Sequence, residues 1–417
     1  DEATTALDVT VQAQILELLK ALVRDRGIAC LMISHDLAVV RQSCDRVYVM
    51  HRGRVVESGS SREVIENPRH PYTQSLLASL PALRPAREVT TNTSGCVLEV
   101  ESLSVRHYRT GRRRSHPASQ LTAVEDVSLE LRTGETLALV GESGCGKSSL
   151  LAAIAGLVPS EGVLRFAGHA GRPAPGFVQM VFQDPYSSLD PRMTVSQVIA
   201  EPLRAHFKLS AKERDEKAGE SLKAVGLSPD FLNRRASQFS GGQRQRIAIA
   251  RALALDPKVL VADEPVSALD VSTQAQIVNL LQSIQEERNI SYILVSHDLR
   301  LVYHLATRVV VMYLGKVVEE GACDDVVANP QHPYTAALLS AVPALDEASR
   351  RDRIVLNGAP PSPIARPTGC SFHPRCPIAR PECSTNMPEL QTMPNGRKVA
   401  CFYPGELQPH ISFTSSK

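Results

Sequence analysis

The strongest chemical signal in this sequence is a glycine-rich string, GESGCGKSS, at residues 141–149. The apolar run TLALV at 136–140 precedes it and the helix-forming run SLLAAIAGL at 149–157 follows it, which predicts a strand, a loop and a helix. In such a loop the backbone N–H groups converge on phosphate oxygens, and the helix points its positive end at the same anion. Lys147 would sit between the β- and γ-phosphates of a nucleotide, and the Ser148 hydroxyl would bind Mg²⁺. The predicted nucleotide-binding residues of the string are Gly141, Glu142, Ser143, Gly144, Cys145, Gly146, Lys147, Ser148 and Ser149.

Two further apolar runs end in residues that could act on a bound phosphate. KVLVAD at 258–263 reads as a buried parallel strand, and the carboxyl ends of such strands face the ligand crevice of an open α/β sheet. Asp263 would hold Mg²⁺, and Glu264 would polarise the attacking water as a general base. SYILVSH at 291–297 predicts another strand, and it ends in His297. A lone histidine at a strand end is most often structural, so His297 gains weight only from its neighbours.

A second potential anion site lies at the start of another predicted helix. FSGGQRQR at 239–246 places glycines at a helix N-terminus, where backbone N–H groups attract negative charge. One domain has no use for two such phosphate sites. The sequence therefore suggests that this helix serves a nucleotide bound to another domain.

The order of these strings resembles the ATP-binding cassette (ABC) family, whose members close two domains head to tail around ATP. The strings are GESGCGKSS, then FQDP at 182–185, FSGGQRQR, VLVADEPVSALD at 259–270 and SHD at 296–298. The resemblance implies an α/β fold, a P-loop NTPase domain of the ABC type in which a mixed sheet is packed with helices and carries a helical subdomain. It also implies ATP and Mg²⁺ as cofactors and ATP hydrolysis as the activity.

The same resemblance implies roles for further residues. His297 would be the switch histidine that touches the γ-phosphate, and Gln183 would sense Mg²⁺ and couple to a membrane partner. Asp270 would line the dimer seam. Tyr108 would stack on adenine, although an ordinary core or surface tyrosine is nearly as good an interpretation. The residues that would contact the γ-phosphate held by the partner domain are Ser240, Gly241, Gly242 and Gln243.

Longer strings resemble one branch of the family, the oligopeptide, dipeptide and nickel importers. They are QDPYSSLDPRMTVSQVIAEPL at 183–203, NP-x-HPYT at 67–73 and 329–335, and GCSFHPRCPIARPEC at 369–383. The resemblance implies a subunit that hydrolyses ATP to energise an importer of di- or oligopeptides. The alternative substrates are nickel and glutathione. It implies two membrane permease subunits as partners, an indirect link to an extracytoplasmic solute-binding protein, and a peripheral place on the cytoplasmic face of the inner membrane.

A more distant alternative is a soluble ABC ATPase of DNA repair or translation. The interval 149–239 has no sustained heptad, unlike the coiled-coil insertions of the repair members. Residues 84–97 do not form the long charged helical linker of the translation members. These two observations favour the importer.

The chain also contains an internal repeat. Residues 1–83 align with residues 263–345 without a gap, and 40 of the 83 positions are identical. We expect residues 1–83 to be the C-terminal part of a first ATPase domain, 84–97 a linker, 98–345 a complete second ATPase domain and 346–417 a C-terminal region. This implies an N-terminally truncated piece of a tandem protein, with the other ATPase half in the full-length chain. A relic half-domain kept as a docking piece is the alternative.

Four of the nine cysteines lie in that C-terminal region with the spacing C-x5-C-x6-C-x17-C: Cys370, Cys376, Cys383 and Cys401. Four thiolates suit an iron–sulfur cluster or structural zinc. The spacing lacks the tight C-x-x-C pairs of zinc ribbons, and the branch resemblance implies a [4Fe-4S] cluster. Four reduced, buried thiols without a metal remain the alternative.

The bulk composition limits the other possibilities. With 22% charged and 43% hydrophobic residues, the 417-residue chain is typical of globular proteins. A net charge of +2 argues against nucleic acid as a partner. No apolar run approaches the roughly 18 residues of a membrane span, and no secretory signal opens the sequence. We therefore expect a cytosolic protein whose membrane role is peripheral.

Overall fold

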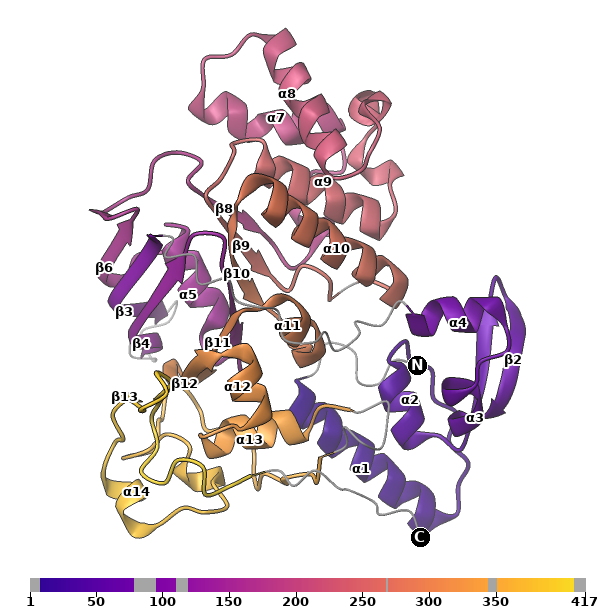
Figure 1. The fold of residues 1–417 in the computed structure, drawn as a ribbon, viewed down its shortest axis with the longest axis vertical. Helices are drawn as coiled ribbons and strands as arrows, with labels where there is room; N and C mark the ends of the chain where they lie inside the picture. The colour runs from indigo at the N-terminus through magenta and orange to yellow at the C-terminus, as the bar shows by residue number, and fades with distance from the viewer. Residues whose placement is uncertain (1–7, 79–94, 110–118, 268, 344–350, 409–417) are drawn as a thin grey trace.

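The structure is a computed structural model, and it describes residues 8–78, 95–109, 119–267, 269–343 and 351–408. Figure 1 shows helices α7, α8 and α9 gathered at one end of the molecule, beyond strands β8 and β9. At the other end, residues 351–408 lie beside β12 and α13, and the helices and strands of residues 8–78 lie to one side. No helix in these ranges is long and apolar enough to cross a membrane.

An eight-stranded mixed sheet forms the centre, in the order β13-β14-β12-β11-β5-β10-β9-β8. Its strands are β5 (Thr136–Val140), β8 (Val178–Val181), β9 (Val259–Asp263), β10 (Ser291–Val295), β11 (Arg308–Tyr313), β12 (Lys316–Ala322), β13 (Gln391–Thr392) and β14 (Lys398–Val399). The run from β8 to β11 is parallel, and β12, β14 and β13 extend it antiparallel. Every residue of β5, β9 and β10 is buried, which explains their unbroken apolar sequences.

Alternate residues of the central strands face two different hydrophobic cores. Leu137 and Leu139 of β5 belong to the core shared with a second sheet, whereas Ala138 and Val140 face the core under α12 and α13. The second sheet is antiparallel, in the order β4-β3-β6-β7. Its strands are β3 (Cys96–Arg109), β4 (Ser119–Arg132), β6 (Glu161–Phe166) and β7 (His169–Ala170). Helix α5 (Lys147–Ile154) packs against strands of both sheets, so both sheets hold the loop that precedes it.

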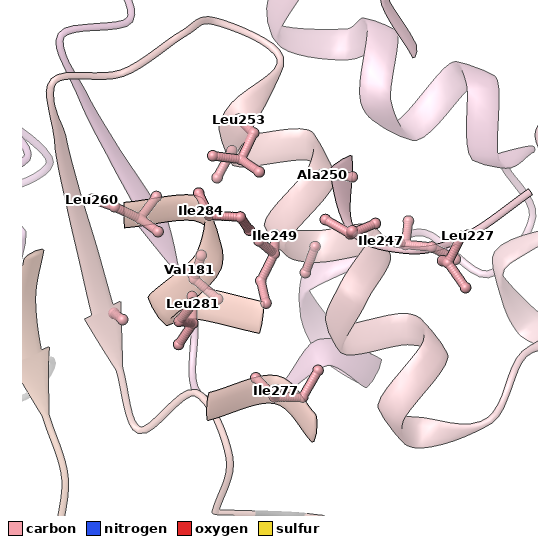
Figure 2. Close-up of a cluster of buried hydrophobic side chains, with 14 of the residues drawn as sticks. Val181, Leu227, Ile247, Ile249, Ala250, Leu253, Leu260, Ile277, Leu281 and Ile284 are labelled. Atoms are coloured by element: carbon pink, nitrogen blue, oxygen red, sulfur yellow. The ribbon is translucent and has the colours of Figure 1, made fainter. Parts of the chain in front are cut away.

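A third core joins the helical part to the sheet. In Figure 2, Ile249 and Leu253 of α9 lie toward Ile284 of α10 and Leu260 of β9, and Ile247 lies toward Leu227. This packing anchors the helix that follows the SGGQ string. The elements of this part are α6 (Pro185–Ser188), α7 (Val195–His206), α8 (Ala211–Ala224), the 3₁₀ helices η1 (Pro229–Asn233) and η2 (Ala236–Gln238), α9 (Gly241–Leu253) and α10 (Val271–Arg288).

Residues 9–78 form six elements, each with a counterpart 262 positions later that has matching bounds. They are α1 (Val9–Arg26), α2 (Leu37–Ser43), β1 (Arg46–His51), β2 (Arg54–Ser60), α3 (Ser61–Glu66) and α4 (Pro71–Ala78). The counterparts are α10, α11 (Leu299–Leu305), β11, β12, α12 (Cys323–Ala328) and α13 (Pro333–Ser340).

One segment of these residues differs from its counterpart. Residues 28–34 form no strand, although they match the region of β10. Leu31 is 87% exposed, whereas its counterpart Ile293 is fully buried. Strand β10 lies between β5 and β9, and residues 28–34 pair with no strand among those that the structure describes.

The C-terminal region adds strands to the central sheet rather than standing apart. It contains η3 (His373–Arg375) and α14 (Pro381–Thr385), and its strand β14 pairs with β12 through Glu319 and Val399.

The linker predicted for 84–97 falls largely outside the described residues. Residues 96 and 97, which the prediction includes in the linker, belong instead to β3, which begins at Cys96 and pairs with β4.

Candidate functional site

The strand register brings the predicted site residues to one edge of the central sheet. Val295 of β10 is paired with Leu139 of β5 on one side and with Asp263 of β9 on the other. The glycine-rich loop and the acidic pair therefore leave the sheet side by side, as expected for parallel strands. His297 lies two residues beyond the end of β10, not on the strand as its sequence suggested.

The loop at 141–146 has backbone geometry that requires glycine at particular positions. Gly146 has φ +110°, and a Cβ there would lie 2.3 Å from the carbonyl oxygen of Ala123. Gly141 has φ +150°, and its Cβ would lie 2.2 Å from the oxygen of Met312. Helix α5 begins directly at Lys147, whose Nζ donates to the carbonyl oxygens of Gly141 at 2.6 Å and Glu142 at 3.0 Å. The lysine thus lies over its own loop, where the oxygens of a phosphate could replace these carbonyls.

Glu264 is the centre of a polar cluster. Its Oε2 accepts a hydrogen bond from Gln183 Nε2 at 2.8 Å and lies 3.2 Å from His297 Nδ1. The backbone of Glu264 has φ +47°, a left-handed conformation that is uncommon for residues other than glycine. Three residues from separate strand ends are therefore brought together, as the sequence suggested.

Charge in this cluster stabilises the ionised carboxylate. Burial acts to raise the pKa of Glu264, but the hydrogen bond and charge of His297 outweigh it, so the pKa is lowered. The pKa of His297 is raised, chiefly because of its hydrogen bond to Glu264. Glu264 is consequently an ionised acceptor at neutral pH, as a general base must be.

The predicted magnesium ligands are only partly assembled. Burial raises the pKa of Asp263, and a hydrogen bond from the Ser148 side chain acts in the opposite direction. The two side chains are therefore in contact. Gln183, the third predicted ligand, instead donates to Glu264. Ser148 and Asp263 are therefore the pair that could hold a cation beside the phosphate loop.

The SGGQ string forms a regular helix start. Ser240 caps α9: its Oγ accepts from Gln243 N at 3.4 Å, and the Gln243 side chain accepts from Ser240 N at 3.1 Å. A Cβ on Gly242 would lie 2.3 Å from Thr273, so glycine allows α9 to approach α10 closely. Asp270 caps α10 and accepts from Thr273 N at 3.0 Å. Ser240 and Asp270 are exposed, and their roles toward a second domain stay predictions.

Tyr108 lies near the end of β3 and is 70% exposed. Its neighbour His107 places Nε2 3.0 Å from the Ser149 hydroxyl of the phosphate loop region, a contact that the sequence did not suggest. Successive side chains of a strand point to opposite faces, so the contact of His107 does not itself bring the Tyr108 ring to the loop. Stacking on adenine stays a prediction.

Several residues that sequence reasoning missed lie directly on the phosphate loop. Asp8 accepts hydrogen bonds from Ser143 N at 2.7 Å and Ser143 Oγ at 2.9 Å, and Thr10 Oγ1 donates to Glu142 Oε1 at 2.8 Å. Asp8 is the counterpart of Asp270 in the repeat. The sequence predicts that Asp270 lies on a domain seam. The repeat could therefore have identified Asp8 as a residue that contacts another domain.

The four cysteines of the C-terminal region line one small cavity of about 20 Å³. Burial raises the pKa of Cys376 to about 11, and burial together with the neighbouring thiols raises that of Cys401 to about 12. Throughout the described ranges, no group of three or more His, Cys, Asp or Glu side chains is arranged to hold a metal ion. The structure therefore brings the four thiols around one cavity, and the metal centre stays a prediction.

Comparison with known proteins gives consistent matches. Residues 124–267 match the family described as ABC transporter, and residues 56–105 and 318–383 match the family described as oligopeptide/dipeptide transporter, C-terminal region. The glutathione import ATP-binding protein GsiA of Pectobacterium atrosepticum is 45% identical over 398 residues, covering 87% of this chain and 64% of the relative. GsiA of Escherichia coli K12 is 43% identical with the same coverage. The chain thus spans 64% of the length of these relatives.

The chain is also similar to a solved structure. The ATP-binding cassette MJ0796, in a dimeric post-hydrolysis state bound to ADP and Pi, is 29% identical; the match covers 54% of this chain and 98% of that one with a TM-score of 0.47.

Proposed function

We propose that the chain is an ABC transporter ATPase of the oligopeptide, dipeptide and glutathione importer branch, which binds ATP with Mg²⁺ and hydrolyses it to energise solute import. The observation that carries this proposal is the cluster of Gln183, Glu264 and His297. The cluster lies at the edge of the sheet where the glycine-rich loop begins. The cluster supports the proposal because it holds an ionised carboxylate at the sheet edge where the loop would bind the γ-phosphate.

Each residue has a distinct task in the proposed reaction. Lys147 Nζ exchanges the carbonyls of Gly141 and Glu142 for β- and γ-phosphate oxygens. Ser148 and Asp263 would hold Mg²⁺, which would supply positive charge to balance that of the phosphates. Glu264 accepts the proton of the attacking water. His297 helps to keep the Glu264 carboxylate ionised, and the hydrogen bond from Gln183 helps to orient it.

We infer further that two ATPase domains share the site. The element-by-element match of residues 9–78 with 271–340 supports assigning residues 1–83 to a first domain and 98–345 to a second. Asp8 on Ser143 supports a seam on which the loop of one domain touches the phosphate loop of the other. By symmetry Asp270 lies on the opposite seam, and Ser240 to Gln243 serve a nucleotide bound elsewhere.

Nucleotide binding and phosphate release measured with and without Mg²⁺ test the proposed activity. Lys147→Met should abolish tight ATP binding, because the loop then lacks its point charge. The matched control is Lys208→Met, which removes an exposed lysine of the helical part. If Lys147→Met and Lys208→Met bound ATP equally well, the assigned site would be wrong.

The partners and the substrate extend the proposal. The similarity to this importer branch supports two membrane permeases as partners, an extracytoplasmic solute-binding protein acting through them, and a peripheral position at the cytoplasmic face of the inner membrane. Peptides are the proposed substrates, and glutathione, itself a tripeptide, is the alternative that the GsiA relatives favour. Co-purification with the permeases encoded beside the gene, followed by uptake of labelled dipeptide and glutathione, distinguishes the two. Co-purification with ribosomes instead would reject the importer assignment.

We also propose that Cys370, Cys376, Cys383 and Cys401 bind one metal centre, a [4Fe-4S] cluster rather than Zn²⁺. The support is that all four thiols line one cavity in a segment with few regular elements, where a four-thiolate donor set suits either group. The centre would act as a structural staple. Anaerobic purification should give about four iron and four sulfide per chain. One zinc would change the metal, and no metal would reject the site.

A further inference from the structure

Arg375 of the C-terminal region reaches into the phosphate loop. Its guanidinium donates to Glu142 Oε2 at 2.7 Å and to Glu142 Oε1 at 3.0 Å, in a bidentate pair. Both side chains are 3% exposed. Arg375 ends η3 and directly precedes Cys376, whereas Glu142 follows the first glycine of the loop, 233 positions earlier. The pair therefore joins two parts of the chain that the sequence does not relate.

All the polar atoms of Glu142 are engaged. Its backbone N–H donates to Tyr334 Oη at 2.7 Å, and its carbonyl oxygen accepts from Lys147 Nζ at 3.0 Å. Its Oε1 also accepts from Thr10 Oγ1 at 2.8 Å. Arg375 completes this set and also approaches Tyr313 Oη at 3.4 Å. Glu142 is thus bound by three separate parts of the chain: Tyr334 of α13, Thr10 of the first repeat copy and Arg375 of the C-terminal region.

The charge of Glu142 explains why such a partner is needed. A carboxylate in a loop that binds a triphosphate repels the ligand, and a buried carboxylate without a partner is strongly unfavourable. Arg375 cancels this charge. It does so without approaching the mouth of the loop, because it binds the carboxylate and not the backbone N–H groups that face phosphate.

We propose that Arg375 is a positioning residue for the nucleotide site, which acts through Glu142 to hold the phosphate loop in its binding conformation. The folded C-terminal region thereby controls the affinity of the loop for a nucleoside triphosphate. The expected change in ATP affinity rests on the proposed ATP-binding function. The expected change in loop conformation does not depend on that function.

A second buried ion pair provides a matched control. Arg397 of the C-terminal region pairs with Glu319 of β12, with side-chain exposures of 3% and 0%, and also donates to the carbonyl oxygen of Asn329 at 2.8 Å. This pair fastens the same region to the same sheet and makes no contact with the loop. A purely anchoring role predicts equal effects of Arg375→Met and Arg397→Met on the nucleotide site. A positioning role predicts a difference.

The experiment measures ATP affinity, the KM and kcat of hydrolysis, and hydrogen exchange of the amides of residues 142–144 in the full chain. Arg375→Met should weaken ATP binding about tenfold or more and raise KM with a smaller change in kcat, while Arg397→Met stays within about threefold of the wild type. The doubly neutral variant Glu142→Gln with Arg375→Met should recover most of the affinity, which separates lost charge balance from misfolding. Faster loop exchange in Arg375→Met than in Arg397→Met is expected even before nucleotide is added.

Each outcome has a defined meaning. Equal loop exchange and equal affinity in the two arginine variants would overturn the inference, as would wild-type affinity in Arg375→Met. A wild-type protein that binds no ATP but shows the expected exchange difference would reject the proposed function and leave the positioning role of Arg375 supported.

Discussion

At the scale of single residues, the site is a set of opposed effects that leave Glu264 ionised. Burial alone would favour its neutral form, but His297 and Gln183 both contact Oε2. The left-handed backbone at Glu264, held by its N–H bond to Val295 O at 2.9 Å, directs the carboxylate toward these partners. The carboxylate is therefore ionised and oriented in the absence of a nucleotide, as the proposed role of a base requires.

Replacing Glu264 by Gln should lower ATP turnover at least ~100-fold while ATP binding is retained, because the isosteric amide cannot accept the proton of water. Phosphate release and nucleotide binding measure the two effects separately. Glu287→Gln, an exposed position on α10, is the matched control and should leave both unchanged. Turnover within a few-fold of wild type would remove Glu264 from the role of base.

The pKa of His297 should lie above 6.5 in the wild type and fall in Glu264→Gln, because the hydrogen bond that raises it is lost while burial still lowers it. A raised folded-state pKa means that the pair stabilises the fold fully below pH 6.5 and loses this contribution as pH rises through the folded-state value. NMR titration of the imidazole checks the shift. A His297 titration that Glu264→Gln does not move would contradict the proposed coupling.

At the scale of elements, caps and edge contacts hold the strand ends in place. His332 caps α13, with Nδ1 accepting from Tyr334 N at 3.0 Å, and Tyr334 in turn accepts from the phosphate loop at Glu142 N. Glu319 of β12 accepts from the backbone N–H groups of Gln331 and His332, both at 2.9 Å. Tyr334 therefore contacts the loop directly, whereas Glu319 fixes the chain that leads from β12 to α13.

Protonation of His332 should destabilise this element. Burial lowers the pKa of His332 to about 3, so the stability it contributes is present above pH 6.5 and is lost as pH falls toward 3. His332→Asn keeps a capping side chain but does not titrate, so its thermal unfolding midpoint should fall less between pH 7 and pH 4.5 than that of the wild type. The matched variant is His70→Asn at the less buried cap of α4, with Nδ1 3.1 Å from Tyr72 N. Identical pH dependence in wild type and His332→Asn would rule out this role.

At the scale of the whole molecule, polar contacts attach residues 8–78 to the rest of the described chain, and two of them involve predicted site residues or equivalent positions of the repeat. One is Asp8 on the phosphate loop. The other is Arg300, which donates to both carboxylate oxygens of Asp36 at 3.1 and 3.0 Å and to Asp298 at 3.1 Å. Asp36 and Asp298 are equivalent positions of the repeat, so a single arginine joins the two copies at matching helix starts.

Arg300→Met should loosen the contact between the copies, since two aspartates are left facing each other without a cation. Losing a charge-assisted pair of this kind costs about 1.5–3 kcal/mol. Hydrogen exchange of α2 and α11 should accelerate. Arg192→Met, which breaks only an exposed pair with Asp190, should not change it. Unchanged protection of α2 in Arg300→Met would show that Arg300 does not join the copies.

The sequence by itself determined the local chemistry of this protein. Glycines with required backbone angles, buried strands with unbroken apolar residues, and polar residues directly after those strands are local features, so β5, β9, the start of α9 and the meeting of Asp263, Glu264 and His297 could be predicted. The repeat was also visible in the sequence alone. Each of these features depends on neighbours in the chain or on the register of parallel strands.

Only the tertiary structure decided the contacts between distant segments. No local pattern relates Arg375 to Glu142 or Asp8 to Ser143, because these pairs depend on how whole segments pack. The repeat shows the same effect for secondary structure. Ile293 is buried in β10 between two strands, whereas its counterpart Leu31 is exposed in a segment without a strand. Similar residues adopt different structures because a strand exists only where neighbouring strands complete its hydrogen bonds and cover its faces.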